Sequence, residues 1–246
     1  MKSQLRAEFL KQRTTRTTVG MLVAVLGLVV AAVAVHAFGL PLHSVGSGSN
    51  QLGIFIDVGE NLGALFAALI GAMAMTGEIR HGTIRPTLLS TPQRGRMVAA
   101  KAVTVSVTGI AFGALATAAA AGAGSLFLGM RNVGLQVTSG DYVLLVAGGA
   151  AAAALWAVIG LGVGAVVRSQ VPVLVGILVW VLFVENILVG SVPSVGKFAP
   201  AALGRAIAGA SNGAVNAPAA GAALLIFYAA VALTLGWAAT TRRDFP

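Results

Sequence analysis

The chain consists of long apolar runs separated by short polar segments. A helix that crosses a hydrocarbon layer of ~30 Å needs about 20 mainly apolar residues, because each residue adds about 1.5 Å. Six runs reach this length, at roughly residues 19–38, 54–76, 98–127, 142–167, 171–189 and 218–240. They are rich in Ala, Leu and Gly and lack the alternation that marks membrane strands. The pattern predicts an all-α membrane protein with six transmembrane helices in a single domain, residues 1–246.

Composition supports lipid as the solvent of this chain. Of its 246 residues, 57% are hydrophobic and only 9% are charged, whereas a soluble domain carries about 25% charged residues. A net charge of +9 on a soluble chain would suggest nucleic acid. Here the basic residues lie in short segments between apolar runs, so we expect no nucleic-acid partner. The chain has no cysteine, which excludes disulfides, thiolate catalysis and cysteine-ligated metals.

The basic residues also predict an orientation, because cytoplasmic loops retain lysine and arginine. With the N-terminus inside, the outer segments hold only Arg131, Lys197 and Arg205 of the 16 basic residues. We therefore expect a multi-pass protein of the plasma membrane with both termini cytoplasmic. The first run also resembles a secretory signal, but its ~20 apolar residues exceed the usual 7–15 of a signal core.

The N-terminal segment, residues 1–18, reads MKSQLRAEFLKQRTTRTT. Met1, Leu5 and Phe9 recur at a four-residue spacing with basic residues around them. This pattern predicts a helix that lies in the inner headgroup region of the membrane. A merely solvated basic tail is the alternative.

The segment between the second and third spans, residues 77–97, interrupts the apolar pattern with four arginines and two prolines. Thr83 can cap a short helix by accepting an amide hydrogen bond, and Pro92 can end it. Leu88 and Leu89 would give that helix an apolar face, which predicts insertion into a groove on another protein. The alternative is that the arginines bind anionic headgroups, at about 1 kcal/mol each.

The order of these features resembles the permease subunits of type-2 ABC exporters. The residues that carry the resemblance after the second span are Glu78, Gly82, Thr83, Ile84, Arg85, Leu88, Leu89, Ser90, Pro92, Arg94 and Lys101. In that family an acidic residue, a Gly-Thr pair, a hydrophobic residue and Arg, two leucines and a proline form the coupling helix that docks on the ATPase subunit. The later run RSQVPVLVGILVWVLFVEN, residues 168–186, is similar to the start of the family's fifth span. The resemblance covers essentially the whole chain, although no single motif is as strict as a Walker loop.

The resemblance implies partners rather than a catalytic site. We expect two copies of a cytoplasmic ABC ATPase subunit, which would hold ATP and Mg²⁺, together with a second permease copy and membrane lipid. The chain itself lacks the phosphate-binding pattern G-x-x-x-x-G-K-[ST], and its nearest approach is GSVPSVGKF at residues 190–198. We therefore expect no catalytic, cofactor-binding or metal-binding residues in this chain. The residues implied for ATPase docking, within the coupling segment 78–97, are Glu78, Gly82, Thr83, Arg85, Leu88, Leu89, Pro92 and Arg94.

Ionisable groups inside a span cost ~3 kcal/mol on insertion scales and are candidates for function. Asp57 and Glu60 lie three residues apart at the outer end of the second span, which places them on one helical face, with Asn61 adjoining. Glu185 and Asn186 lie near the outer end of the fifth span. We expect both groups at similar depth, around the outer mouth of a pathway or at a dimer interface. The alternative for Asp57 and Glu60 is contact with interfacial water.

Two further features concern packing and the outer loop. Five glycines predict close approach of helix backbones; they are Gly59, Gly63, Gly160, Gly162 and Gly164. The outer segment, residues 191–217, is too broken by Pro and Gly to span the membrane, so we expect a loop or re-entrant segment. Residues 199–211 within it are expected to form a short helix at the outer surface.

The favoured function is a permease that forms the translocation pathway for an amphipathic or lipid-like substrate, such as a drug, natural product or lipid. A secondary transporter would be expected to show internal repeats and paired broken helices, which we do not find. An intramembrane enzyme would need more than the single E-x-x-H pair of Glu78 and His81. A membrane scaffold without transport is also compatible with the sequence.

Overall fold

The computed structural model describes residues 2–83, 94–210 and 217–242, and all regular structure in these residues is helical. Six helical stretches are long and apolar enough to cross a membrane. They are α2 (Arg16–Gly39), the α4–η1–α5 stretch (Gly48–Arg80), α7 (Arg94–Met130), α8 (Ser139–Val167), the α9–η2–α10 stretch (Gln170–Ser191) and α13 (Pro218–Arg242). The prediction of six spans in an all-helical membrane protein is confirmed.

Two of these stretches contain a π-helical turn. The second consists of α4 (Gly48–Phe55), η1 (Ile56–Glu60) and α5 (Asn61–Arg80), and the fifth of α9 (Gln170–Val179), η2 (Trp180–Val184) and α10 (Glu185–Ser191). The described residues also hold four shorter helices: α1 (Lys2–Thr14), α3 (Leu42–Val45), α11 (Pro193–Gly196) and α12 (Pro200–Ile207). Such π-turns are rare and concentrate at functional sites. Acidic residues lie in the first of these two turns and directly after the second.

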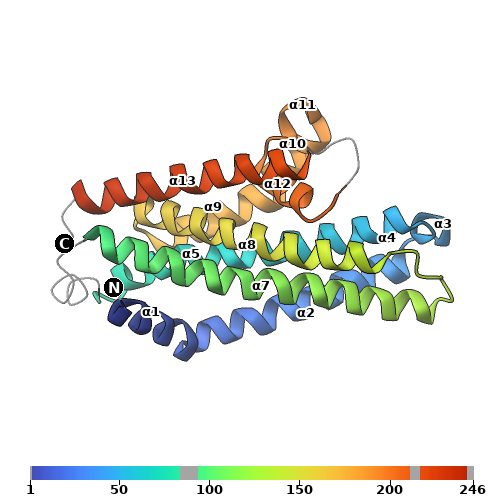
Figure 1. Ribbon diagram of the computed structural model, residues 1–246, viewed down its shortest axis with the longest axis horizontal. Coiled ribbons are helices and arrows are strands. Elements are labelled where there is room, and N and C mark those ends of the chain that lie inside the picture. The colour runs from blue at the N-terminus through green and yellow to red at the C-terminus, as the bar shows by residue number, and fades with distance from the viewer. Residues whose placement is uncertain (1, 84–93, 211–216, 243–246) are drawn as a thin grey trace.

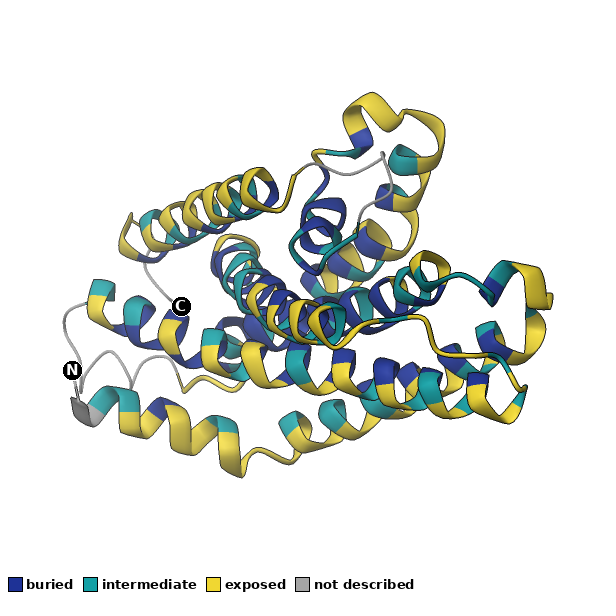
Figure 2. Cartoon of the chain, turned by 45° about the vertical axis from the view of Figure 1, so that its right-hand side comes forward, coloured by how far each residue is buried: buried dark blue, intermediate teal, exposed yellow. Residues whose placement is uncertain are grey.

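Helices α5 and α8 form the centre of an elongated bundle (Figure 1). Helix α8 packs against α5, α7 and α13, and α2 packs against α7. Figure 2 shows the buried residues on the helix faces that turn inward, while the outer faces of α2 and α13 are largely exposed. In a membrane protein these outer faces meet lipid or another protein, because the exposed side chains are mostly apolar.

Small residues allow the central helices to approach closely. A Cβ added at Gly160 or Gly164 of α8 would collide with the backbone of α5, and one at Gly162 would collide with α13. Gly59 and Gly63 of the second stretch meet α7 in the same way. Without a hydrophobic driving force between helices in lipid, such close packing is a principal source of helix association. The packing role predicted for these glycines is confirmed.

The bundle has two chemically different ends. We call the end that holds α1, the last turn of α5, the first turn of α7 and the last turn of α13 the basic end (Figure 1). Arg94 Nη1 donates to the Thr240 carbonyl at 2.9 Å, and Arg168 Nη2 donates to the Ala239 carbonyl at 2.6 Å. These bonds satisfy carbonyls at the C-terminus of α13, where the last carbonyls of a helix have no N–H donor within the helix. The opposite end holds α3, α4, η1 and the α10–α12 segment.

Replacing Gly160 by Ala should destabilise the bundle, because the added Cβ would collide with the Ala68 backbone on α5. Overpacking of this kind costs about 1–3 kcal/mol, so unfolding in detergent, followed by tryptophan fluorescence, should start at a lower temperature. Gly27→Ala on α2 is the matched control, since its Cβ would meet nothing within 4 Å. Equal melting of the two variants would contradict the packing described here.

Candidate functional site

Four charged side chains from three helices form a closed network at the basic end, which we call the charge cluster. Helix α1 contributes Glu8 and Lys11, α5 contributes Glu78 and α7 contributes Lys101. Glu78 Oε1 accepts from both lysines, each Nζ lying at 2.7 Å. Glu8 accepts from Lys11 at 3.1 Å and from Lys101 at 3.0 Å. Each carboxylate therefore meets two ammonium groups, and the charges balance.

Burial makes this cluster different from an ordinary surface ion pair. The Lys101 side chain is 1% exposed and the two carboxylate side chains are each 10% exposed, while Lys11 is 48% exposed. A buried charge without a partner costs several kcal/mol, so Lys101 must keep at least one carboxylate beside it. The cluster thus fixes α1 on the ends of α5 and α7.

The surrounding charges shift the pKa values of the two α1 residues. Burial alone would raise the pKa of Glu8, but Lys101 and Lys11 outweigh it and hold this pKa below 4.5. Burial would lower the pKa of Lys11, whereas Glu78 and Glu8 raise it above 10.5. The stabilisation from Glu8 is thus present above pH 4.5 and is lost as the pH falls through its lowered pKa. The stabilisation from Lys11 is present below pH 10.5 and is lost as the pH rises through its raised pKa.

The end of α5 brings the first of the expected docking residues beside this cluster. Gly82 has a φ of +68°, the left-handed conformation that glycine adopts most easily. Its amide donates to the Ile79 carbonyl at 3.3 Å, and the Thr83 amide donates to the Glu78 carbonyl at 3.0 Å. This pair of bonds is a Schellman motif, which stops the helix and turns the chain. Thr83 therefore lies directly beside the charge cluster.

The remaining docking residues divide into two groups. Arg94 begins α7 and donates to the end of α13, as described above. Arg85, Leu88, Leu89 and Pro92 lie outside the described residues. Sequence reasoning missed Glu8 as a member of the cluster. The available signals were an acidic residue in an otherwise basic N-terminal segment and a lysine inside an apolar run.

At the opposite end, Glu185 holds the N-terminus of α12. It accepts from Trp180 Nε1 at 2.6 Å and from the Ala201 amide at 2.7 Å. The Ala201 amide is one of the first N–H groups of α12, which lack partners within the helix and carry its positive dipole end. Asn186 is exposed and donates to the Val181 and Leu182 carbonyls of η2. Glu185 is thus a fixed contact between α10 and α12.

Glu60 meets the same short helix but has no hydrogen-bond partner. It is fully buried, and neither carboxylate oxygen bonds to any described residue. A Cβ on Gly204 of α12 would collide with Glu60 Oε1, so a larger residue there would require the Glu60 side chain to shift. The adjoining Asn61 Oδ1 is also buried without a partner. Residues 201 and 204 are neighbours on one face of a helix, so α12 brings the two glutamates to a common surface.

Asp57 differs from Glu60 in burial, although both side chains meet α12. Its side chain is 59% exposed and pairs with Arg205 of α12 at 3.4 Å, whereas Glu60 is buried. Both residues belong to the π-turn η1, whose i→i+5 bonds widen the helix. Neither Arg205 nor Trp180 was predicted from the sequence as a partner of these acidic residues.

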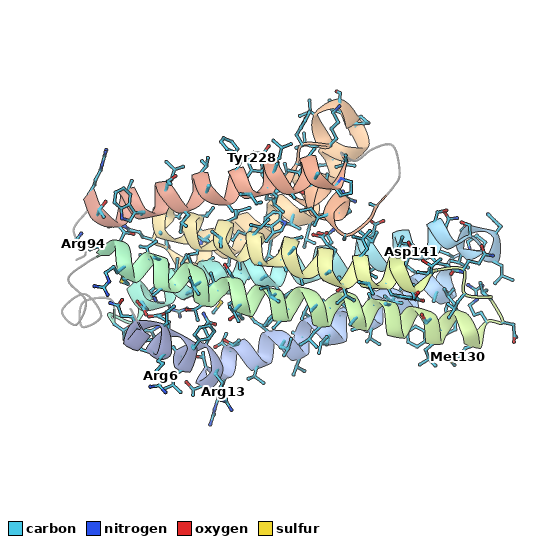
Figure 3. The ribbon with its side chains drawn as sticks, viewed as in Figure 1. Arg6, Arg13, Arg94, Met130, Asp141 and Tyr228 are labelled. Atoms are coloured by element: carbon cyan, nitrogen blue, oxygen red, sulfur yellow. The ribbon has the colours of Figure 1, made fainter. Side chains whose placement is uncertain are left out.

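The expected helix in residues 199–211 forms as α12 (Pro200–Ile207), and one of its faces is buried against other helices. Its buried residues are Ala201, Ala202, Leu203, Gly204 and Ala206. It packs against α13 and α8, and Tyr228 of α13 donates to the Phe198 carbonyl just before it (Figure 3). Its small side chains allow this depth of burial. Within the part of the chain described, no three His, Cys, Asp or Glu side chains are placed to hold a metal ion.

Replacing Lys101 by Met should destabilise the fold by about 3–5 kcal/mol, because it removes the buried partner of two carboxylates. Lys11→Met is the matched comparison and should cost at most about 1 kcal/mol, since Lys11 is half exposed. Thermal unfolding and hydrogen exchange in α1 measure both effects. A larger loss for Lys11→Met would refute the assignment of Lys101 as the central charge.

Replacing Glu185 by Ala should loosen α12, because the Ala201 amide and the Trp180 indole lose their acceptor. Leaving buried donors unpaired costs about 1–3 kcal/mol. Glu185→Gln keeps an acceptor oxygen and should lose less. Hydrogen exchange in residues 200–207 checks this order, and faster exchange in the Gln variant than in the Ala variant would contradict it.

Comparisons with known proteins leave the family open. No family model matches the chain, and no curated protein matches it. Support for a function therefore comes from the sequence and from the two polar ends of the bundle.

Proposed function

We propose that this chain is the permease subunit of an ATP-driven exporter of the type-2 ABC class. In this proposal two copies of a separate cytoplasmic ATPase subunit supply ATP and Mg²⁺, and two permease copies form the pathway in the plasma membrane. The proposal rests on the resemblance of the residues between the second and third spans and on the geometry at their two ends.

The charge cluster is the observation that carries the proposal. It joins α1 to the last turn of α5 and to the third turn of α7, and these are the two helices on either side of residues 84–93 in the sequence. A force applied by a docked partner to this short segment would therefore act on three helices at once. A loop that only attracts anionic lipid would not need the buried charge cluster between the two helices that it connects.

The basic end is assigned to the cytoplasm by the positive-inside rule, with both termini on that side. Arg6 and Arg13 project from α1 away from the bundle (Figure 3). Phe9 and Leu10 are exposed on the same helix. Cationic and apolar side chains on the outer surface of α1 suit a helix lying in the inner headgroup region.

The opposite end supplies the candidate gate. Helix α12 covers Glu60 and is held by Glu185 and by the Asp57–Arg205 pair, with Asn61 and Asn186 on the two adjoining stretches. An outward movement of α12 would expose the two buried glutamates together. We assign the outer gate to this contact and the ATPase docking surface to residues 78–94.

In the proposed cycle, ATP binding closes the two ATPase subunits and draws the coupling segments together. The charge cluster passes this movement to α1, α5 and α7, and the permease dimer changes between inward-facing and outward-facing states. The apolar outer faces of α2 and of the fifth stretch are available to lipid and to the second copy. An apolar pathway favours amphipathic or lipid-like cargo, such as a drug, natural product or lipid, over small ions.

Replacing Leu89 by Asp should abolish substrate-stimulated ATP hydrolysis in the assembled complex, because a charge on the docking face would have to be desolvated against the ATPase. Membrane insertion of the permease should be unchanged. Leu135→Asp is the matched control: this exposed leucine lies in the loop between α7 and α8, at the end of α7 opposite Arg94. Coupled hydrolysis at the wild-type rate in the Leu89 variant would remove the docking assignment.

A further inference from the structure

A cavity of about 330 Å³ lies beside the charge cluster, between α1, α2, α5 and the start of α9. This volume is at the lower end of the range for small-molecule sites, about 300–1,000 Å³. It is large enough for the head group and part of one chain of an amphiphile. Its wall includes the four members of the charge cluster, together with His81 and Thr83.

The lining changes character with depth. Ile70, Met73, Ala74 and Met21 are buried or half-buried and form an apolar floor. Thr15 and Thr17 are exposed and, with neighbouring polar side chains, form a rim of hydroxyl and amide groups; the other polar rim residues are Gln12, Thr18 and Gln170. An apolar floor below a rim of groups that both donate and accept hydrogen bonds matches a molecule with the same division.

One acceptor in the cavity wall is unused. Glu78 is 9% exposed, and while its Oε1 accepts from both lysines, its Oε2 is buried and has no partner among the described residues. An unused buried carboxylate oxygen in a native fold calls for an explanation, such as a ligand or an ordered water. A hydroxyl or amide group of a ligand would satisfy it by donating a hydrogen bond.

The charges in the wall indicate which head group fits. Glu8 and Glu78 are balanced by Lys11 and Lys101, so the cluster offers neither an excess cation nor an excess anion to a charged ligand. A charged head group would have to be desolvated here without a counter-charge, which is unfavourable. An uncharged hydroxylated head group meets no such penalty.

We infer that this cavity binds a single-chain amphiphile with an uncharged, hydroxylated head group, its hydroxyl donating to Glu78 Oε2 and its chain lying on Met21, Ile70 and Met73. The inference deepens the proposed function by naming a ligand class and a site at the basic end. Binding to the permease alone does not need the ATPase, so this claim and the proposed function can fail separately.

Gly77 provides a way to fill the cavity without disturbing its walls. It lines the cavity, and a Cβ built on it would meet nothing within 4 Å. Gly77→Leu therefore places a side chain in open space and leaves all four members of the charge cluster in place. Gly27→Leu is the matched control, because Gly27 also lies inside a helix with nothing within 4 Å but is remote from the cavity lining.

The test uses the full chain in phosphatidylcholine nanodiscs and a monolauroylglycerol probe with a diazirine in its acyl chain. A second probe has the same chain, but both glycerol hydroxyls are methylated. After illumination, mass spectrometry should locate saturable labelling on Met21 or residues 70–77. The methylated probe should label about tenfold less, the factor expected for one lost hydrogen bond to a charged group. Gly77→Leu should also reduce labelling about tenfold, and Gly27→Leu should leave it unchanged.

Equal labelling by the two probes, or full labelling of Gly77→Leu protein that elutes and melts like wild type, would overturn the inference. A second arm identifies the source of the natural ligand, using vesicles that hold the permease with its ATPase. Loss of bound probe that depends on ATP would identify the ligand as cargo, and retention in ATP would identify a resident hydroxylated lipid. The site is supported in either case, whereas only the first supports transport.

Discussion

A charge removed from water must keep an opposite charge beside it, and this constraint organises the basic end of the bundle. Lys101 is almost fully buried within the first turns of α7, and the carboxylates that neutralise it come from two other helices. If α1 left the bundle, Lys101 would therefore keep only one carboxylate partner, Glu78. The same contact positions the end of α5, where Gly82 turns the chain toward residues 84–93.

The second constraint is steric and acts through the middle of the bundle. In lipid, helices gain little from burying apolar side chains, so they associate where backbones can approach. Glycines on α8 face both α5 and α13, which makes α8 the common contact of the core. At the two ends, by contrast, charged side chains hold α1 and α12 to this core.

At the opposite end, the two buried glutamates differ in their hydrogen-bond partners. Glu185 receives two donors and fixes the N-terminus of α12, while Glu60 lies against Gly204 with no donor. Each glutamate adjoins a π-turn, which changes the direction in which the side chains of its stretch point. The two glutamates thus lie against the same eight-residue helix, one with two donors and the other with none among the described residues.

The sequence by itself determined the six spans, the all-helical class and the glycine contacts, because these depend on the length of apolar runs and on residue size, which are local properties. It also singled out Glu60 and Glu185, since a charge in an apolar run is visible without a fold, and it singled out Glu78 through the family resemblance. Only the tertiary structure decided their partners. Glu8 and Lys101 are 93 residues apart, and the residues that Asp57 and Glu60 meet lie on α12, far along the chain. Pairing and burial depend on which helices pack together, and one chain position carries no record of its distant neighbours.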